Sequence, residues 1–184
     1  MSNLLFFLLM LIPFAGFIWS SLFYFNHGNE KNIELILIKF CGLFTILANL
    51  ILIFLPNSVI FEIQIFGGAF ILISSLLFYW AINSNKKKSL SFAFTYIEIS
   101  NLNTSGVYKY MRHPLYSSYI FGWLGGFFIN QHWILIPTSC LLVFLYFKSI
   151  KNEEDGFLNG PNREKYFHYM QTTGRLLPKL FHVG

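Results

Sequence analysis

The chain has 184 residues, of which 55% are hydrophobic, 20% aromatic and only 11% charged. Soluble domains carry about 25% charged residues, and a small aqueous core would not bury 23 phenylalanines without large apolar surface patches, so the composition predicts an integral membrane protein. The net charge of +5 does not indicate nucleic acid as a partner, because the basic residues gather at the ends of apolar runs, where anionic lipid headgroups are the simpler partner.

Three apolar runs in the N-terminal half are each long enough to cross a bilayer as a helix. They extend over Leu4–Phe25, Ile33–Leu55 and Ile63–Ile82, and about 20 apolar residues suffice for one crossing. A cleaved signal peptide is a poor interpretation of the first run, which lacks a basic n-region and an A-x-A-like cleavage site. We therefore expect residues 1–85 to form three spans.

The fourth apolar region, Leu115–Phe147, is interrupted only by Asn130-Gln131-His132. It predicts a hairpin of two helices of roughly 16 residues, each about 24 Å long and thus shorter than a hydrocarbon core of roughly 30 Å. Such a hairpin draws its polar ends below the membrane surface. The predicted fold is all-α, a polytopic membrane protein with about five transmembrane helices.

The Lys and Arg residues predict the orientation of these spans. They are frequent in the loop 83–112 and in the tail 148–184, and absent from the loop 56–62 and the turn 130–132. Because cytoplasmic loops carry the excess of Lys and Arg, we expect the N-terminus outside and a cytoplasmic C-terminal tail. Every polar cluster of interest then lies on the cytoplasmic face.

The stretch "SNLNTSGVYKYMRHPLY" (100–116) precedes the hairpin. Pro114 suits the first turn of a helix, where its missing N–H is no loss, so we expect the helix to begin there with His113 as its cap. The N–H groups at such a helix start form a natural seat for an anion. Arg112 adds a fork that can grip a carboxylate.

Two adjacent acids, Glu153 and Glu154, follow the hairpin. A hairpin returns the chain to the side it left, so these acids are predicted to lie near His113. Two carboxylates beside an Arg–His pair form a polar pocket at the membrane surface. The carboxylates suit the paired hydroxyls of a ribose or a cationic ligand, and the Arg–His end suits an anion.

Other interpretations of the same residues remain open. Arg112 and the lysines are also explained as positive-inside anchors, and the neighbouring tyrosines as an interfacial aromatic belt. A metal site is not indicated, because one His beside two acids falls below the usual ligand count and no HExxH spacing occurs. The two cysteines, Cys41 and Cys140, lie in apolar runs and indicate neither a disulfide framework nor a metal site.

Two flanking segments have their own patterns. Tyr166, Tyr169 and Met170 fall at i, i+3 and i+4 and predict a short amphipathic helix, either a cover over the pocket or a juxtamembrane anchor. In 89–100, large apolar residues recur at every second position, at Leu90, Phe92, Phe94 and Tyr96, and predict an extended stretch at the interface rather than a helix.

Three sequence blocks together resemble the C-terminal region of the isoprenylcysteine carboxyl methyltransferase family and the related phospholipid methyltransferases. They are "TSGVYKYMRHPLY" (104–116), "EE" (153–154) and "YFHYMQTTGRLLP" (166–178), in the order that the family has. The resemblance implies an integral membrane enzyme that uses S-adenosylmethionine, bound without a Gly-rich loop. The resemblance covers about residues 100–180, which it marks as the cofactor-binding region, and the length of the chain allows one domain over 1–184, with three spans in 1–85.

The resemblance also implies site residues. We assign the catalytic positions to Arg112, His113 and Glu154. The cofactor-binding positions are Ser100, Asn101, Leu102, Asn103, Tyr108, His113, Pro114, Leu115, Tyr116, Glu153 and Glu154. Family members that act on prenylcysteine carry an Arg shortly before the acidic pair; here Lys148 and Lys151 are the candidates to hold the substrate, as point charges rather than forks.

The resulting prediction is methyl transfer to a lipophilic acceptor from the bilayer, with isoprenylcysteine-like carboxyl O-methylation first. Methylation of a phospholipid amine or a small thiol is the close alternative. Further alternatives are an NADPH-dependent enzyme similar to sterol reductases, which share a similar C-terminal pattern, and a non-catalytic membrane scaffold. Transfer to a carboxylate or thiolate needs no strong base, so catalysis would rest on positioning and on exclusion of water.

Overall fold

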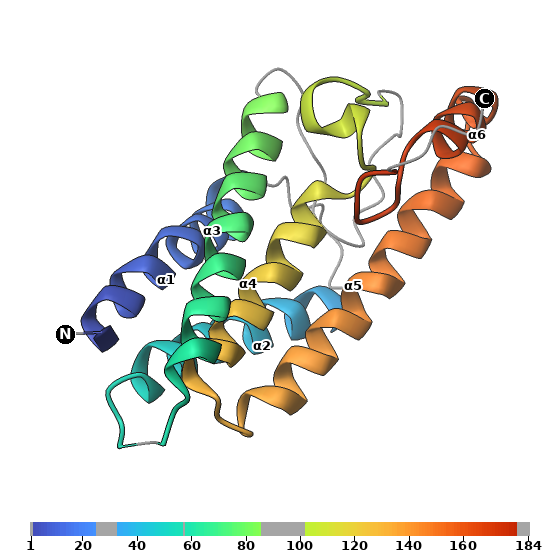
Figure 1. Ribbon diagram of the computed structural model, residues 1–184. Coiled ribbons are helices and arrows are strands. Elements are labelled where there is room, and N and C mark those ends of the chain that lie inside the picture. Colours follow the sequence, from blue (N-terminus) through green and yellow to red (C-terminus); the bar gives the residue numbers. More distant parts are fainter. Residues whose placement is uncertain (1, 25–32, 57, 86–101, 180–184) are drawn as a thin grey trace.

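The computed structural model describes residues 2–24, 33–56, 58–85 and 102–179, and apart from turns and an isolated β-bridge between Met111 and Gly174 the described chain is helical (Figure 1). The predicted extended stretch at 89–100 lies outside the described residues, as do Ser100 and Asn101 of the expected cofactor set. In chain order the elements are α1 (Ser2–Trp19), the π-helical turn η1 (Ser20–Tyr24), α2 (Ile33–Leu52), α3 (Phe61–Ser84), the 3-10 turn η2 (Gly106–Lys109), α4 (Pro114–Asn130), α5 (Leu135–Leu158) and α6 (Arg163–Thr172).

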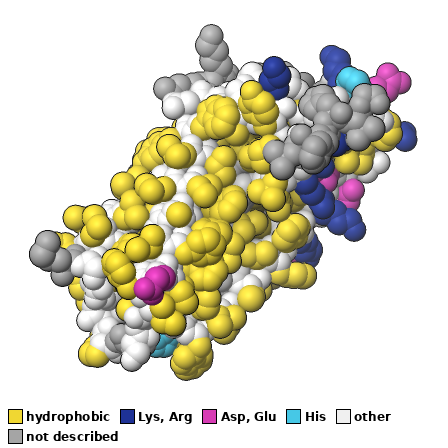
Figure 2. All heavy atoms as spheres, in the orientation of Figure 1, with side chains coloured by type: hydrophobic (Ala, Val, Ile, Leu, Met, Phe, Trp, Pro, Cys, Tyr) yellow, Lys and Arg dark blue, Asp and Glu magenta, His cyan; other side chains and the backbone are white. Residues whose placement is uncertain are grey.

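The three predicted N-terminal spans are confirmed as helices. Among the described residues, Ser2–Leu22, Ile33–Leu52 and Phe61–Ser84 are long and apolar enough to cross a membrane. Each presents large apolar side chains on its outer face, and Phe40 and Leu76 are each 71% exposed. Figure 2 shows apolar side chains covering most of the visible face, while the basic side chains gather toward the end where α5 and α6 meet. This distribution fits a molecule whose sides contact lipid.

The predicted hairpin is present, with α4 and α5 joined by a short turn. Gln131 ends α4 in the left-handed conformation, with φ 48°, and its N–H donates to the Phe127 carbonyl. The expectation that the second arm ends at Phe147 is wrong, because α5 continues to Leu158. The arm continues beyond the apolar run through polar residues, of which the Lys and Glu residues have good helix propensity, and Ile150 and Glu154 are buried one turn apart on its inner side.

Helices α3 and α4 run antiparallel and pack against each other along most of their length (Figure 1). Their backbones approach closely at Gly67 and Gly125, where a Cβ on Gly67 would lie 2.8 Å from the Gly125 carbonyl oxygen. Ser74 strengthens the contact by donating to the Ser118 carbonyl at 2.7 Å. Small residues and interhelical hydrogen bonds are the usual means of helix association in membranes. This pairing holds the start of α4, and the site there, against the bundle.

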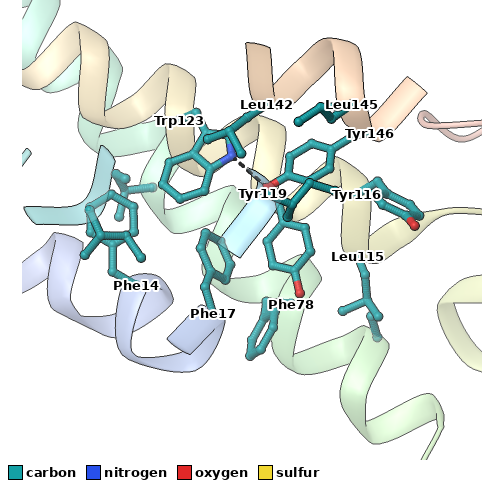
Figure 3. Packing of buried hydrophobic residues seen from close by; sticks show 14 of the residues in the cluster. Phe14, Phe17, Phe78, Leu115, Tyr116, Tyr119, Trp123, Leu142, Leu145 and Tyr146 are labelled. Carbon is teal, nitrogen blue, oxygen red and sulfur yellow. Dashed lines mark hydrogen bonds between the residues drawn. The ribbon is translucent and has the colours of Figure 1, made fainter. Parts of the chain in front are cut away.

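An aromatic cluster connects α1, α3, α4 and α5, and it lies just beyond the first turn of α4 (Figure 3). Phe17 makes edge contacts with Tyr119, at a ring-centroid distance of 4.6 Å, and with Phe78 at 5.4 Å. Trp123 donates from its indole N–H to the Tyr146 hydroxyl at 3.3 Å. Edge-to-face contacts of this kind stabilise a fixed arrangement of rings.

The chain after α6 returns to the start of α4, and we call residues 173–177 the C-terminal strap. Its Gly174 N–H donates to the Tyr110 carbonyl at 3.2 Å, and its carbonyls accept from the backbone N–H groups of Arg112 and His113 at 2.9 and 3.1 Å. Gly174 suits this bend because a Cβ there would clash with the Leu177 carbonyl oxygen. The strap fastens the tail to the segment that carries Arg112 and His113.

Candidate active site

The site begins where α4 starts and α5 ends. His113 caps α4, and Pro114 occupies its first position, as the sequence predicts. Because the hairpin brings the two ends together, His113 Nε2 lies 3.1 Å from Oε1 of Glu154 and His113 Nδ1 lies 3.6 Å from Oε2 of Glu153. The Arg–His pair and the two acids are therefore neighbours in space.

Glu154 is the buried anion of this cluster, with a side chain only 8% exposed. Three basic side chains surround its carboxylate: Arg112 with Nε at 3.0 Å, His113 with Nε2 at 3.1 Å and Arg175 with Nη2 at 2.7 Å. Burial alone would raise the pKa of Glu154, but the hydrogen bonds and charges of His113 and Arg112 outweigh it and lower the pKa to about 2. The carboxylate is thus ionised at every physiological pH.

Arg112 is engaged on both sides of its guanidinium. Besides Glu154, it donates from Nη1 to the carbonyl oxygens of Thr173, at 2.7 Å, and of Met170, at 3.3 Å. The sequence analysis assigned the guanidinium of Arg112 to the carboxylate of a ligand. In the structure this group binds a carboxylate of the protein, Glu154, and the C-terminal strap instead. Arg112 links α5 to the strap.

Glu153 lies in a different environment, although it is the adjacent residue. Its side chain is 33% exposed. The Tyr116 hydroxyl donates to Glu153 Oε1 and lies 2.7 Å from the Ser149 hydroxyl oxygen, so one tyrosine bridges α4 and α5. Glu153 therefore keeps part of its carboxylate surface open to a cavity.

His113 is buried between the two acids. Burial disfavours its charged form, but the hydrogen bonds and charges of Glu153 and Glu154 outweigh that cost and raise its pKa above the usual 6.5. An imidazolium at this position neutralises part of the acidic pair and is held in a fixed orientation by it.

A cavity of about 420 Å³ extends from this cluster to α1, η1 and α2. Its polar end consists of Arg112, His113, Tyr116 and Glu153. Its walls are mostly apolar and are formed by Phe17, Ile18, Ser21, Leu22, Ile38, Lys39, Gly42, Leu43, Ile46, Tyr108, Pro114, Leu115, Tyr119, Trp123 and Tyr146. Figure 3 shows several of these rings, Phe17, Tyr116, Tyr119 and Tyr146, converging from α1, α4 and α5.

A sequence model of the phospholipid methyltransferase family matches residues 63–160, which is more than half of the chain. This chain belongs to the phospholipid methyltransferase family. The match spans α3, α4 and α5 and includes Arg112, His113 and both acids, so the resemblance inferred from short blocks is confirmed. No curated protein matches the chain. By family, the protein is a membrane methyltransferase.

Six of the expected cofactor residues of this phospholipid methyltransferase family member line the cavity: Tyr108, His113, Pro114, Leu115, Tyr116 and Glu153. Glu154 lies behind His113 and is not part of the lining. Leu102 lines a second cavity of about 510 Å³ beside α6, and Asn103 donates to Asn85 Oδ1 at 2.7 Å and to the Ser84 carbonyl. The structure therefore brings six residues of the expected set together and places Leu102, Asn103 and Glu154 outside the cavity lining.

The two lysines expected to hold the substrate lie elsewhere. Lys148 forms an ion pair with Glu34 on α2, and Lys151 is an exposed residue of α5. Neither residue lines the cavity. The extension of α5 as a helix accounts for this, because Lys151 and Lys148 precede Glu153 by two and five positions, and residues at these spacings do not share a helix face.

Several residues of the site escaped the sequence analysis. Arg175 lies in the quoted block "GRLLP" but had no assigned function, and Ser149 was detectable only as the residue one helical turn before Glu153. No sequence signal marked the contribution of α1 and α2 to the cavity. Within the described ranges no group of three or more His, Cys, Asp or Glu side chains is arranged to hold a metal ion.

Proposed function

We propose that this protein is an S-adenosylmethionine-dependent methyltransferase that acts on a lipophilic acceptor held in the bilayer. The observation that carries the proposal is one continuous cavity with a charged end at His113 and Glu153 and an apolar wall of α1 and α2. Such a shape suits a polar methyl donor at one end and a lipid at the other. When bound, S-adenosylmethionine supplies a methyl group on a positively charged sulfur.

The residues at the polar end fit this donor. A volume of about 420 Å³ lies within the usual range of roughly 300–1,000 Å³ for small-molecule sites. The partly exposed carboxylate of Glu153 suits ribose hydroxyls or a cationic group, and the first N–H groups of α4 suit the donor's carboxylate. We assign cofactor contact to Glu153, His113 and Tyr116, and assign positioning of His113 to Glu154 and Arg112.

The acceptor that the site favours is the amine of a phospholipid headgroup. A carboxylate acceptor is best bound by a guanidinium through two hydrogen bonds, but the guanidinium of Arg112 is already engaged by Glu154 and the strap. An ammonium instead suits the open carboxylate of Glu153. This acceptor must lose a proton before its nitrogen lone pair forms the new bond to carbon, and Glu153, beside the polar opening, is placed to accept that proton.

Carboxyl O-methylation of an isoprenylcysteine-like acceptor is the second candidate. It is favoured by the sequence blocks at 104–116 and 166–178 and by an apolar wall that accepts a prenyl chain as well as an acyl chain. In either case the closed aromatic floor of the cavity limits water near the reacting atoms, and the fixed polar end orients them.

We further propose that α4 and α5 are the fourth and fifth membrane spans and that the site faces the cytoplasm. The proposal follows from the positive-inside distribution of Lys and Arg, which the tail and the loop before η2 carry. Cysteine-accessibility labelling from either side of sealed vesicles, with cysteines placed at Lys109 and at His132, tests this orientation.

Detergent-purified protein titrated calorimetrically with S-adenosylmethionine and with NADPH tests the function. We expect saturable binding of S-adenosylmethionine and none of NADPH. Radiolabelled methyl transfer should then be measured with phosphatidylethanolamine, a prenylcysteine and simple thiols. Absence of S-adenosylmethionine binding up to millimolar concentration would refute the proposal, and binding without transfer to any acceptor would support a scaffold instead.

A further inference from the structure

One buried hydroxyl of the cavity has a hydrogen for which the described residues offer no acceptor. The indole N–H of Trp123 donates to the Tyr146 hydroxyl at 3.3 Å (Figure 3). Because an indole only donates, the tyrosine oxygen is the acceptor of this bond, and the hydrogen of the hydroxyl remains to be donated. Tyr146 is only 4% exposed, and a buried donor without an acceptor costs free energy. An oxygen atom of a ligand can satisfy this donor.

The neighbouring hydroxyl groups of the cavity donate within the protein. Tyr116 donates to the Glu153 carboxylate. Ser20 donates its one hydrogen to a backbone carbonyl of α1 at 3.0 Å, so its oxygen accepts from the Tyr119 hydroxyl at 3.3 Å. Tyr146 therefore differs from Tyr116 and Tyr119 in having a hydrogen to give to a ligand.

The position of Tyr146 indicates which kind of oxygen fits. Tyr146 and Trp123 both line the cavity. The rings of Tyr116 and Tyr119 each lie 5.6 Å from the Tyr146 ring, so its immediate surroundings are aromatic and uncharged. A neutral oxygen suits such surroundings better than an anion, because burial of an unpaired charge costs far more. Along α5, Tyr146 precedes Glu153 by seven residues, about 10 Å along the axis.

We propose that Tyr146 donates a hydrogen bond to an ester carbonyl of the acceptor lipid and thereby selects for ester-linked over ether-linked chains. This inference rests on the proposed function, in which the reacting group lies at Glu153. An acyl ester joins the chain to the headgroup several bonds from the reacting group, as Tyr146 lies two turns of α5 from Glu153. A carbonyl oxygen is a good hydrogen-bond acceptor, whereas an ether oxygen is a weaker one. Tyr146 thus acts on the linkage of the chain and not on the headgroup.

The test compares two lipids that differ in this linkage alone. Detergent-purified full-length protein is first saturated with S-adenosylhomocysteine, the demethylated donor, so that no turnover occurs. It is then titrated calorimetrically with dihexanoyl-phosphatidylethanolamine and with its di-O-hexyl ether analogue. Both titrations are repeated with Tyr146→Phe and with Tyr166→Phe. Tyr166 is the matched control, because it is 2% exposed, its hydroxyl has no hydrogen-bond partner among the described residues, and it lies outside the cavity lining.

We expect the wild type to bind the ester lipid about fivefold to tenfold more tightly than the ether lipid, the gain from one neutral hydrogen bond. Tyr146→Phe should bind both lipids with equal affinity, and Tyr166→Phe should keep the wild-type ratio. The ratio is the informative quantity, because a structural effect of either substitution changes the affinity for both lipids alike. Where Tyr146→Phe does not fold, the wild-type ratio decides.

Three results overturn the inference while leaving the function intact. The first is equal wild-type affinity for the two lipids, which indicates that a water molecule satisfies the Tyr146 hydroxyl. The second is a preference for the ester that persists in Tyr146→Phe. The third is no binding of either lipid by a protein that methylates another acceptor. Failure of the proposed function itself is recognised separately, as a wild-type protein that neither binds S-adenosylmethionine nor methylates any acceptor, and it overturns the inference as well.

Discussion

The polar end of the cavity and its apolar wall are built by different kinds of interaction. At the polar end, Glu154 is held by Arg112, His113 and Arg175 at 2.7 to 3.1 Å, and the C-terminal strap adds backbone hydrogen bonds. The wall of α1 and α2 is formed by apolar side chains, with open space at Gly42. Directional contacts keep one end rigid, whereas the other end has room to accept different chains. We expect changes at the polar end to affect stability and donor binding, and changes in the wall to affect the acceptor.

We expect the largest effect on stability from removal of the buried anion, Glu154. Glu154→Ala leaves Arg112 and His113 buried without their shared partner, and loss of one partner of a buried ion pair costs about 3–5 kcal/mol. We expect a corresponding fall in the free energy of unfolding, measured by thermal or denaturant unfolding in detergent. Asp155→Ala, at the exposed neighbouring position, is the control. Equal stability of the two variants would contradict the assigned structural function of Glu154.

The pH dependence of stability tests the same cluster without mutation. Glu154, with its pKa lowered from 4.5 to about 2, contributes stability above pH 4.5, which is lost as pH falls toward 2. His113, with its pKa raised above 6.5, contributes stability that is fully present below pH 6.5 and is lost as pH rises through its folded-state pKa. We expect the unfolding temperature to be highest between about pH 4.5 and 6.5. In His113→Asn the alkaline decline should disappear, and its persistence would refute the assignment.

The adjacent acids Glu153 and Glu154 allow the two functions to be separated, because Glu154 is buried in the ion-pair cluster and Glu153 faces the cavity. Glu153→Gln keeps hydrogen-bonding groups near Tyr116 and Ser149 but removes the charge. We expect the affinity for S-adenosylmethionine to fall about tenfold, roughly 1.4 kcal/mol, and methyl transfer to an amine to slow because the proton acceptor is lost, with the unfolding temperature nearly unchanged. Calorimetric titration and thermal unfolding of the same preparation measure both quantities. A large loss of stability with normal affinity would reverse the assigned functions of the two acids.

A bulky substitution in the open space of the cavity tests whether the apolar wall of α1 and α2 binds the acceptor. Gly42→Phe places a ring in the open space beside Lys39. We expect kcat/KM for the lipid acceptor to fall about tenfold, equivalent to roughly 1.4 kcal/mol, while the Kd of S-adenosylmethionine is unchanged. Leu47→Phe, on the same helix but outside the cavity lining, is the matched control. Equal acceptor kinetics for both variants would show that the acceptor does not pass Gly42.

The smallest effect is expected at the ion pair between Lys148 and Glu34. Its lysine side chain is 49% exposed, and exposed pairs contribute about 0–1 kcal/mol. Lys148→Met should therefore lower the free energy of unfolding by less than about 1 kcal/mol and leave acceptor kinetics unchanged. An increase in KM for the acceptor would restore the substrate-holding function that the sequence predicted for Lys148.

The helices and the hairpin were predictable because a lipid environment restricts the backbone to few structures. In lipid every backbone polar group must be satisfied within its own segment, so long apolar runs become helices, and α1, α2 and α3 follow the predicted runs closely. The hairpin also determined that His113 and the acidic pair would meet. The end of α5 was misjudged, because the polar residues after Phe147 continue the helix without any apolar signal.

The sequence by itself determined the apolar character of the chain, the positions of the three N-terminal helices long enough to cross a membrane, the cap at His113-Pro114 and the family. Only the tertiary structure decided that Glu154 is buried among two arginines and His113 while Glu153 faces the cavity. It also decided that Arg112 is engaged by the protein itself and that α1 and α2 complete the wall of the cavity. The physical reason is that local pattern sets the helix, whereas the partners of a side chain depend on which segments, distant in the chain, pack beside it. For Glu154 those segments are α4 and the C-terminal strap.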